Sequence, residues 1–478
     1  MIALYLVLAV FAVLIAVIFI RTLLFVSKKE DAVDSYPVSF DTEKAAAALS
    51  EMIKCKTVSD KNSDNEDDAE FEKFKNLLPT LFPVLHEKCE FSSPDKRALL
   101  YRWQGRSEEN PTVLMAHYDV VSADEDKWER PAFSGDVEGG FVYGRGTLDT
   151  KGTLNGILFA AEKLIKEGFV PKNDVYFAFA GDEEISGEGA NSIVNYISSK
   201  GIEPGLVVDE GGAIISDLFP GVSEPCAVVG IAEKGMLNVE YSVNGTGGHA
   251  SAPPRVTPAG ILSRAVLRLE AKPFPFRVTL PVKEMFNTLG RKSTFPYRLI
   301  FANLWCFAPL LDFIAKRSGG QTNAMVRTTL AFTEMEGSHG LNVIPPSARM
   351  TSNLRIMPGE STESALLRIK RTVNDKRIEI KSLGGQEPSR VSSLDCEAYR
   401  RVEKTIKESF GGLTVSPYLM PACSDSRHWS RVSDKVYRFS PYALTKEENA
   451  GVHGNNERIS LENLASIVEF YYRLMKKS

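Results

Sequence analysis

Residues 112–121 have the sequence TVLMAHYDVV, and residues 173–184 have the sequence NDVYFAFAGDEE. Each segment holds a continuous apolar run that ends at titratable groups, His117 in the first and Glu183 and Glu184 in the second. Between them, residues 153–167 have the apolar periodicity of a helix, which Gly168 ends. Apolar strands that alternate with helices are typical of a parallel sheet covered on both faces. The sequence therefore predicts an α/β fold with a mostly parallel central sheet.

The composition is that of a large globular protein with two or three domains. Of the 478 residues, 43% are hydrophobic and 25% are charged, which excludes a disordered or collagen-like chain. The 57 Lys and Arg against 61 Asp and Glu give a net charge of −4, so we expect no nucleic-acid partner. The six cysteines are scattered and form no CxxC pair, which argues against a disulfide scaffold and a Cys-type zinc site.

The N-terminus is a candidate membrane segment. Its first twenty residues contain no charge, and about 20 apolar residues suffice to span a bilayer. The segment lacks the positive start, shorter apolar core and small-residue cleavage site of a signal peptide. We therefore predict a single-pass anchor at 1–26 and a linker at 27–40, with a buried core helix as the alternative. Arg21, Lys28 and Lys29 favour a cytoplasmic body, but three charges leave the side of the membrane open.

After residue 233 the pattern indicates a second domain. Its predicted elements are a strand at 236–243, a helix at 258–269, strands at 323–333 and 348–356, a helix at 362–373 and a strand at 377–383. This β-α-β-β-α-β order is typical of a ferredoxin-like α+β domain. We predict this lid or dimerisation domain at 234–386, inserted between two parts of a catalytic domain at 41–233 and 387–478.

Within the inserted domain, residues 271–320 form an aromatic-rich insertion. Its longest uncharged run, 299–311, has 13 residues, which is too short to span a membrane and suits a buried helix. Additional packing is the simplest interpretation. An apolar acyl-chain site and a membrane-docking surface remain as alternatives.

Titratable side chains follow three of the predicted strands of the catalytic domain. Besides His117 and the pair Glu183 and Glu184, Asp209 ends the apolar run LVV, while Asp149 precedes the predicted helix and His453 lies near the C-terminus. Charged groups at the ends of apolar strands cost stability unless a cation or partner compensates for their desolvation. Imidazoles and carboxylates together suit two zinc-like ions, which can share a bridging carboxylate. Asp119 can accept the second ring N–H of His117 and fix its tautomer.

Seven segments together resemble a known family. They are AHYDVV at 116–121, GRGTLDTKG at 144–152, GDEEISGEGA at 181–190, VVDEGG at 207–212, GTGGHAS at 245–251, SDSRHW at 424–429 and GVHGNNE at 451–457. In this order, over about residues 40–478, the chain resembles the aminoacylase, carboxypeptidase S and desuccinylase family of co-catalytic zinc hydrolases, peptidase family M20. The apolar start, the aromatic insertion and VVDEGG look closest to the carboxypeptidase S branch, which includes the N-fatty-acyl-amino acid synthase/hydrolases.

The resemblance implies two zinc ions per subunit. His117 and Asp209 would bind one, Glu184 and His453 the other, and Asp149 would bridge them, with a cis peptide bond between Asp149 and Thr150. Glu183 would be the general base for the metal-bridging water that attacks the amide carbonyl, and Asp119 would orient His117. The resemblance also implies that His249 binds the oxyanion or the substrate, often across a homodimer formed by the inserted domain. Asn342, Arg355 and Arg427 are the candidates for holding a substrate carboxylate.

These observations predict a zinc-dependent amidohydrolase or carboxypeptidase. Its substrates would be N-acyl-amino acids or small peptides with a free C-terminal carboxylate, and near equilibrium the reaction could also run as a synthesis. The aromatic insertion slightly favours bulky or fatty acyl groups. The alternatives are an aminopeptidase or desuccinylase-type deacylase on the same fold, and a non-catalytic membrane scaffold.

Overall fold

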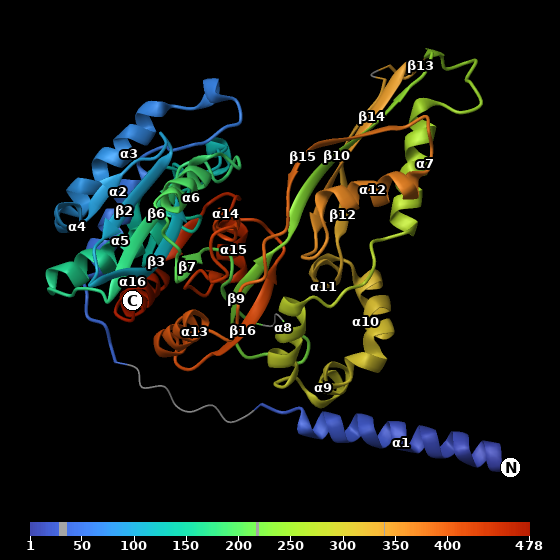
Figure 1. Cartoon of the computed structure of the whole chain (residues 1–478). Helices are drawn as coiled ribbons and strands as arrows, with labels where there is room; N and C mark the ends of the chain where they lie inside the picture. The colour runs from blue at the N-terminus through green and yellow to red at the C-terminus, as the bar shows by residue number, and fades with distance from the viewer. Residues whose placement is uncertain (28–35, 217–218, 339) are drawn as a thin grey trace.

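The computed structural model describes residues 1–27, 36–216, 219–338 and 340–478 (Figure 1). They form two lobes and a separate N-terminal helix, α1 (Ile2–Leu24), which projects away from both. Helix α1 is long and apolar enough to cross a membrane, a property that signal sequences share. Most of the predicted linker, residues 28–35, lies outside the described residues.

The larger lobe is built on a sheet with nine strands among the described residues. Its order is β1 (Glu90–Ser92), β2 (Ala98–Trp103), β6 (Asn173–Ala180), β3 (Ser107–His117), β7 (Leu206–Asp209), β17 (Val436–Arg438), β9 (Cys226–Glu233) and β16 (Thr414–Met420), with β8 (Ile214–Ile215) beside β9. Strands β6, β3, β7 and β17 run parallel, as do β9 and β16. Antiparallel β1 and β2 form one edge. The predicted α/β class with a mostly parallel centre is confirmed.

Helices cover both faces of this sheet, which explains why its strands are continuously apolar. On one face α2 (Thr42–Ile53), α5 (Lys151–Lys166) and α16 (Leu461–Met475) pack together, with α13 (Glu397–Ser409) beside α16. On the other face lie α6 (Gly189–Ser199) and α14 (Ser426–Trp429). Strand β6 is buried from Asp174 to Ala180 as a result. The peripheral elements are the 3-10 turns Ser63–Asn65 and Glu125–Lys127, α3 (Asp68–Leu81), α4 (Pro83–Lys88), α15 (Lys446–Gly451) and the small sheet of β4 (Val137–Glu138), β5 (Phe141–Tyr143) and β18 (Arg458–Ser460).

The smaller lobe is a four-stranded antiparallel sheet with two helices packed on it. The strand order is β12 (Thr329–Glu336), β14 (Ser347–Ile356), β10 (Gly235–Asn244) and β15 (Glu379–Gln386), and the helices are α7 (Pro258–Ala271) and α12 (Thr362–Val373). The chain order β10, α7, β12, β14, α12, β15 is the predicted β-α-β-β-α-β pattern. At its far end, β11 (Gly248–His249) pairs with β13 (Val343–Ile344), which Figure 1 shows well away from the larger lobe.

The insertion differs from its prediction in two places. The strand predicted at 323–333 begins only at Thr329. Residues 323–326 belong instead to a helix, α11 (Gly320–Val326), which packs on α10 (Leu304–Ser318). The uncharged run 299–311 is not one buried helix. It is divided between α9 (Phe295–Ala302) and α10, which meet at an angle of 113° around Asn303. Helix α8 (Leu280–Gly290) precedes them and packs on β16 of the larger lobe.

Candidate metal centre

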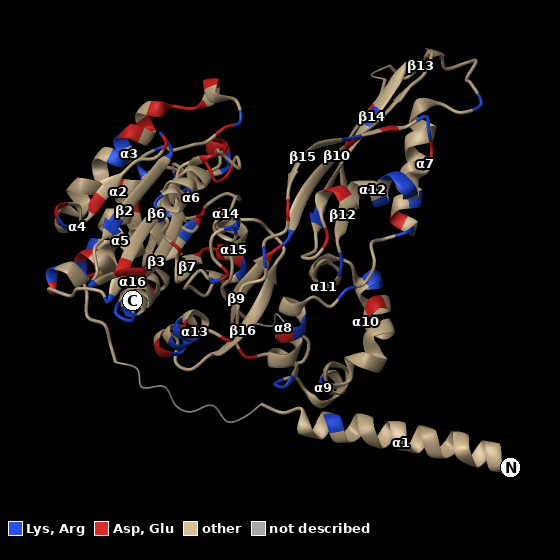
Figure 2. Cartoon of the chain, viewed as in Figure 1, with Lys and Arg blue, Asp and Glu red and all other residues tan. Residues whose placement is uncertain are grey.

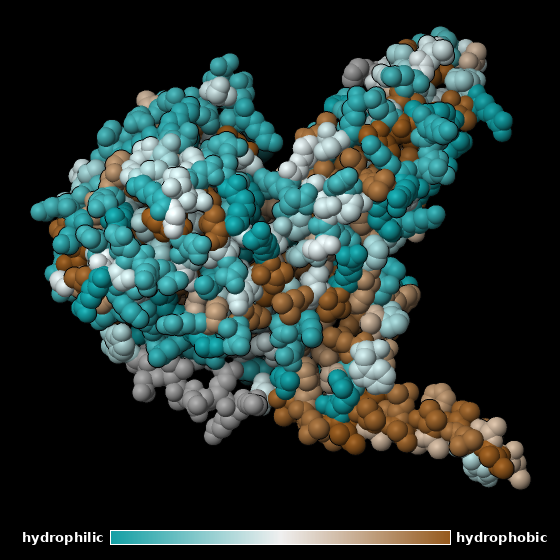
Figure 3. All heavy atoms as spheres, viewed as in Figure 1, coloured by the Kyte–Doolittle hydropathy of each residue, from teal (hydrophilic) through white to brown (hydrophobic). Residues whose placement is uncertain are grey.

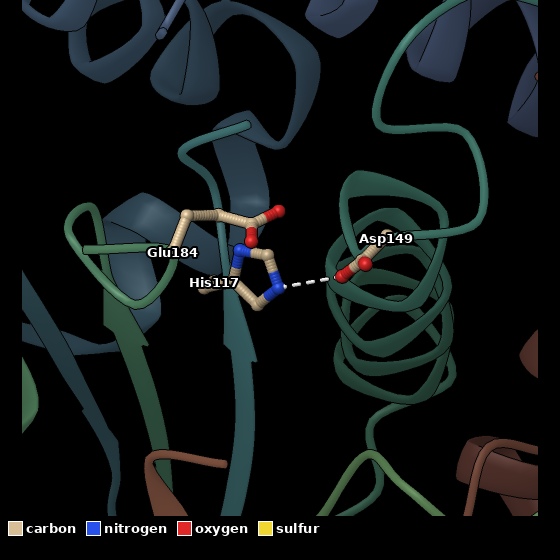
Figure 4. A group of neighbouring side chains, drawn as sticks. All are labelled: His117, Asp149 and Glu184. Carbon is tan, nitrogen blue, oxygen red and sulfur yellow. Dashed lines mark hydrogen bonds and ion pairs between the residues drawn. The ribbon is translucent and has the colours of Figure 1, made fainter. Parts of the chain in front are cut away.

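Four of the predicted side chains meet at the carboxyl edge of the parallel strands. His117 ends β3, Glu183 and Glu184 follow β6, and Asp149 directly precedes the first turn of α5. In α/β sheets this edge is where binding sites collect, because successive loops converge there. Figure 4 shows that the side chains of His117, Asp149 and Glu184 come from three separate segments of the chain and lie close together.

Asp149 lies between two imidazoles. One carboxylate oxygen is 2.8 Å from Nε2 of His117, and the other is 3.0 Å from Nε2 of His453. The same His453 nitrogen lies 3.1 Å from Oε1 of Glu184. The peptide bond between Asp149 and Thr150 is cis, as expected. A carboxylate with one oxygen toward each of two histidines has the arrangement that a bridging metal ligand needs.

Asp119 organises the cluster from behind. Its fully buried carboxylate lies 3.3 Å from Nδ1 of His117 and accepts hydrogen bonds from the backbone N–H groups of Glu183 and Glu184, at 3.2 and 3.1 Å. The fourth contact is a hydrogen bond of 2.7 Å that the hydroxyl of Ser59 donates to the Asp119 carboxylate. One side chain therefore orients a histidine and the loop that presents both glutamates, which is how partners behind metal ligands act.

Two neighbouring acids, Asp209 and Glu210, stand at the end of β7. Oε1 of Glu210 lies 3.6 Å from Nε2 of His117, and Glu210 forms a potential metal-ligand group with His117 and Glu183. Asp209 is not in either such group among the described residues, and its Oδ2 accepts a hydrogen bond of 3.0 Å from the backbone N–H of Ser426. The ligand role of Asp209 stays a prediction. Glu210, the next residue of the segment VVDEGG, is a second candidate, because its carboxylate lies within reach of His117.

The charges around the cluster suit a cation. Burial raises the pKa of Glu183 and of Glu210 well above the usual value, and the neighbouring carboxylates add to this effect. Burial would lower the pKa of His117, but hydrogen bonds with Asp119 and Asp149 outweigh it and place this pKa well above the usual value. The second histidine, His453, has its pKa raised to about 10 by hydrogen bonds with Asp149 and Glu184.

The donors form two overlapping groups, each with ligand atoms within 4.8 Å of one another: His117 with Asp149 and Glu184, and His117 with Glu183 and Glu210. Imidazole nitrogens and carboxylate oxygens are the donor set of divalent metals such as zinc. The residues present therefore fit a metal centre.

Two predicted substrate residues lie beside the cluster. The guanidinium of Arg427 is almost buried and donates from Nη1 to the carbonyl of Ser424 at 2.8 Å, but its Nε and Nη2 have no hydrogen-bond partner among the described residues. Its nearest carboxylate, Asp425, is 3.7 Å away. Arg355, on β14 of the smaller lobe, approaches the same region, with Nη1 3.7 Å from Sγ of Cys423.

His249 and Asn342 lie elsewhere. They meet at the far end of the smaller lobe, where His249 pairs with Val343 across β11 and β13 and the N–H of Ala250 donates to the carbonyl of Asn342 at 2.9 Å. The histidine is exposed, and its Nδ1 lies 2.7 Å from the hydroxyl of Ser251. Figure 3 shows an open hollow between this end of the smaller lobe and the larger lobe. Within one chain, the structure does not bring these two residues to the metal cluster.

The family follows from a comparison with known proteins. The family model "Peptidase family M20/M25/M40" matches residues 113–477, which includes every residue of the cluster. The chain belongs to this family. As an M20-family member it is a metal-dependent hydrolase of amide bonds, and the predicted resemblance is confirmed.

Similar proteins support this assignment. This M20-family chain is 37% identical over 478 residues to the N-fatty-acyl-amino acid synthase/hydrolase PM20D1 of Xenopus tropicalis, covering 98% of this chain and 93% of that one. It is 36% identical over 456 residues to the probable carboxypeptidase S-like 2 of Dictyostelium discoideum, covering 94% and 87%. Its fold resembles that of the M20 family metallo-carboxypeptidase Sso-CP2 of Sulfolobus solfataricus, with a TM-score of 0.66, 18% identity and coverage of 90% and 98%.

Proposed function

We propose that this enzyme holds two zinc ions and hydrolyses the amide bond of N-acyl-amino acids, recognising the free carboxylate of the amino acid. The observation that supports this most directly is Asp149, which lies between two imidazoles with Glu183 and Glu184 beside it. His117 and Glu210 would hold one ion, Glu184 and His453 the other, and Asp149 both. Bound ions of this kind lower the pKa of water and polarise a carbonyl group.

Glu183 is proposed as the general base. Its carboxylate lies in the group with His117 and Glu210, and the loop that bears it is fixed by the hydrogen bond from its backbone N–H to Asp119. A carboxylate held in this way can take a proton from the attacking water and return it to the amine that leaves. Asp119 is a positioning residue in this scheme, because it acts through His117 and the glutamate loop.

Arg427 is proposed to bind the substrate carboxylate. Nε and Nη2 of its guanidinium lie side by side with no hydrogen-bond partner among the described residues, although they are buried. Two adjacent N–H donors match the two oxygens of a carboxylate, so a bound carboxylate would satisfy both. Arg355 is the second candidate from the other lobe. His249 and Asn342 would contribute only across a homodimer, which we propose forms through the inserted domain.

For the acyl group we propose a long aliphatic chain. The support comes from relatives named N-fatty-acyl-amino acid synthase/hydrolases, which are 35–40% identical to this chain. We also propose that α1 remains attached as a membrane anchor, which would bring the enzyme to the place where such amphipathic substrates collect. A carboxypeptidase acting on small peptides is the second candidate, favoured by the similarity to the carboxypeptidase S-like relative.

The test is release of the amino acid from a matched panel. The full-length, zinc-loaded enzyme is assayed on N-fatty-acyl, N-acetyl and dipeptide substrates that share one C-terminal residue. Glu183→Gln serves as the inactive variant. Its matched control is Glu188→Gln, because Glu188 is an exposed acid of the same loop and accepts a hydrogen bond from Asn191. Preference for the fatty-acyl substrates supports the proposal, whereas preference for dipeptides supports the carboxypeptidase. Equal activity of the Glu183→Gln and Glu188→Gln variants would exclude Glu183 as the base.

A further inference from the structure

Helix α1 is joined to the inserted lobe by buried polar contacts. Thr22 and Asn303 are both fully buried, and Nδ2 of Asn303 donates to Oγ1 of Thr22 at 3.1 Å and to the carbonyl of Ile18 at 3.2 Å. The guanidinium of Arg21 donates to the carbonyl of Ala302 at 3.2 Å. Asn303 also donates to the carbonyl of Leu299 at 2.9 Å, so the contacts with α1 add to a hydrogen bond within the insertion. The last turns of α1 are therefore part of the folded protein.

Aromatic side chains extend this junction. The rings of Phe19 and Phe295 are 6.2 Å apart, and the guanidinium of Arg291 lies 4.5 Å from the ring centre of Phe25. The contacts involve α1, α8 and α9, so the end of α1 is held by two different helices of the insertion. Figure 1 shows α1 extending away from these helices along the rest of its length.

The position of these contacts along α1 fixes their depth in a bilayer. A hydrocarbon core of about 30 Å needs about 20 helical residues at a rise of about 1.5 Å per residue. The uncharged run 1–20 has this length, and Arg21 follows it directly, so in a bilayer spanned by α1 the core would end near Arg21. Phe295, which contacts Phe19, and Asn303, which contacts Thr22, thus lie at the boundary between acyl chains and headgroups.

Helices α9 and α10 carry exposed apolar side chains next to α1. We call them the α9–α10 face, and they are Phe295 (39% exposed), Tyr297 (43%), Trp305 (54%), Leu310 (43%), Phe313 (61%) and Ile314 (40%). On α10, residues 310, 313 and 314 have the spacing of one helix side, whereas Trp305 lies on another side of the helix, near the bend to α9. Trp and Tyr are typical of the membrane interface, where an apolar ring with a polar tip is favoured. In Figure 3 the surface of α1 is hydrophobic along its length up to the point where it meets this lobe.

Basic side chains border the α9–α10 face. Lys316, which is ion-paired with Asp312 at 2.7 Å, and Arg317 occupy the last turn of α10, and Arg298 lies 5.9 Å from the ring centre of Phe295. Nearby, Lys272 and Arg368 line a cavity of about 450 Å³ between α7, α10 and α12. Figure 2 shows Lys and Arg on these helices together with some Asp and Glu. An apolar face with a basic border matches acyl chains beside anionic headgroups.

We propose that the α9–α10 face lies in the interface of a lipid bilayer beside α1, so that the inserted lobe is held on the membrane by two elements that are far apart in the sequence. The occupant of this face is lipid. The inference rests on the membrane anchor given under Proposed function. It goes beyond that anchor because it adds a second contact with the bilayer, which fixes the orientation of the lobes to the surface.

The test uses the tryptophan within the face. The full chain is reconstituted in phosphatidylcholine and phosphatidylserine vesicles, with and without bromine on the acyl chains, and tryptophan fluorescence is compared. Helix α1 contains no tryptophan, and of the others Trp103 and Trp429 are buried and Trp128 is partly buried in the larger lobe. We expect brominated lipid to quench the fluorescence, and we expect Trp305→Phe to lose most of this quenching. Trp128→Phe, the matched control, should keep it.

Equal quenching in the wild type and in the Trp305→Phe variant, or none in either, would overturn the inference. If a second copy covered the face instead, quenching would be absent and Phe313→Asp would convert a cross-linked dimer to a monomer. The anchor and the activity are measured separately, by resistance of α1 to alkaline extraction and by hydrolysis of the substrate panel. Failure of the docking inference is thereby distinguished from failure of the proposed function.

Discussion

Exchanging the two neighbouring acids at the end of β7 for their amides tests the metal centre most sharply. Glu210→Gln removes a negative charge 3.6 Å from Nε2 of His117, while Asp209→Asn changes a carboxylate that faces the backbone of Ser426. Both substitutions keep the size and shape of the side chain. Only the loss of Glu210 should therefore weaken metal binding.

The structure sets the scale of the effect. At 3.6 Å and an effective dielectric constant of about 20, two unit charges interact by about 5 kcal/mol. If the substitution removes only half of this energy from the binding of the ion, about 2.5 kcal/mol, the dissociation constant of the ion rises roughly 70-fold. Asp209→Asn can keep the hydrogen bond from Ser426 through its amide oxygen, so we expect unchanged metal content and a loss of about 1–2 kcal/mol in the free energy of unfolding.

The assay is the metal content of each purified variant after dialysis, measured by inductively coupled plasma mass spectrometry. We expect two ions per chain in the wild type and in the Asp209→Asn variant, and one in the Glu210→Gln variant. The opposite result, with one ion lost from Asp209→Asn and both kept by Glu210→Gln, would refute the assignment and restore Asp209 as the ligand.

Three further predictions concern the surroundings of the site. Asp119→Asn should weaken metal binding about 10- to 100-fold, because one amide oxygen cannot accept from Ser59 and two backbone N–H groups at once and the negative charge beside His117 is lost; isothermal titration of the metal-free protein measures this, and unchanged affinity would contradict the positioning role. Arg427→Met should lower kcat/KM about 10- to 100-fold for a substrate with a free carboxylate but not for its carboxamide, since a hydrogen bond to a charged group contributes about 1.5–3 kcal/mol. Burial lowers the pKa of Lys234 to about 7 in the folded protein, whereas in the unfolded chain it is about 10.5. Between these two pH values the unfolded state binds more protons than the folded state, so the free energy of unfolding rises with pH. From pH 7 to 9 the free energy of unfolding should rise about 2 kcal/mol more in the wild type than in Lys234→Met, measured by urea denaturation; identical pH dependence would show that Lys234 is protonated in the folded protein.

Much of the fold is encoded in local sequence patterns. The predicted strand at 175–180 lies within β6, and the predicted helix at 362–373 coincides with α12, because buried strands and amphipathic helices differ in the period of their apolar residues. The insertion was harder to predict. A run of apolar residues does not show where a helix turns, and the bend at Asn303, whose side chain contacts both Leu299 and Thr22, is seen only in the tertiary structure.

The sequence by itself determined which residues are the candidates for the chemistry. His117, Asp149, Glu184 and His453 were identified because each stands beside a predicted strand end or in a family segment, and the tertiary structure places them within hydrogen-bond distance of one another. Only the tertiary structure decided between neighbours and between distant elements. It brought Glu210 within 3.6 Å of His117, left two buried donors of Arg427 without hydrogen-bond partners among the described residues, and set His249 far from the cluster. The physical reason is that local patterns specify the type and period of an element, whereas the direction of a side chain and its partners depend on how elements remote in the sequence pack together.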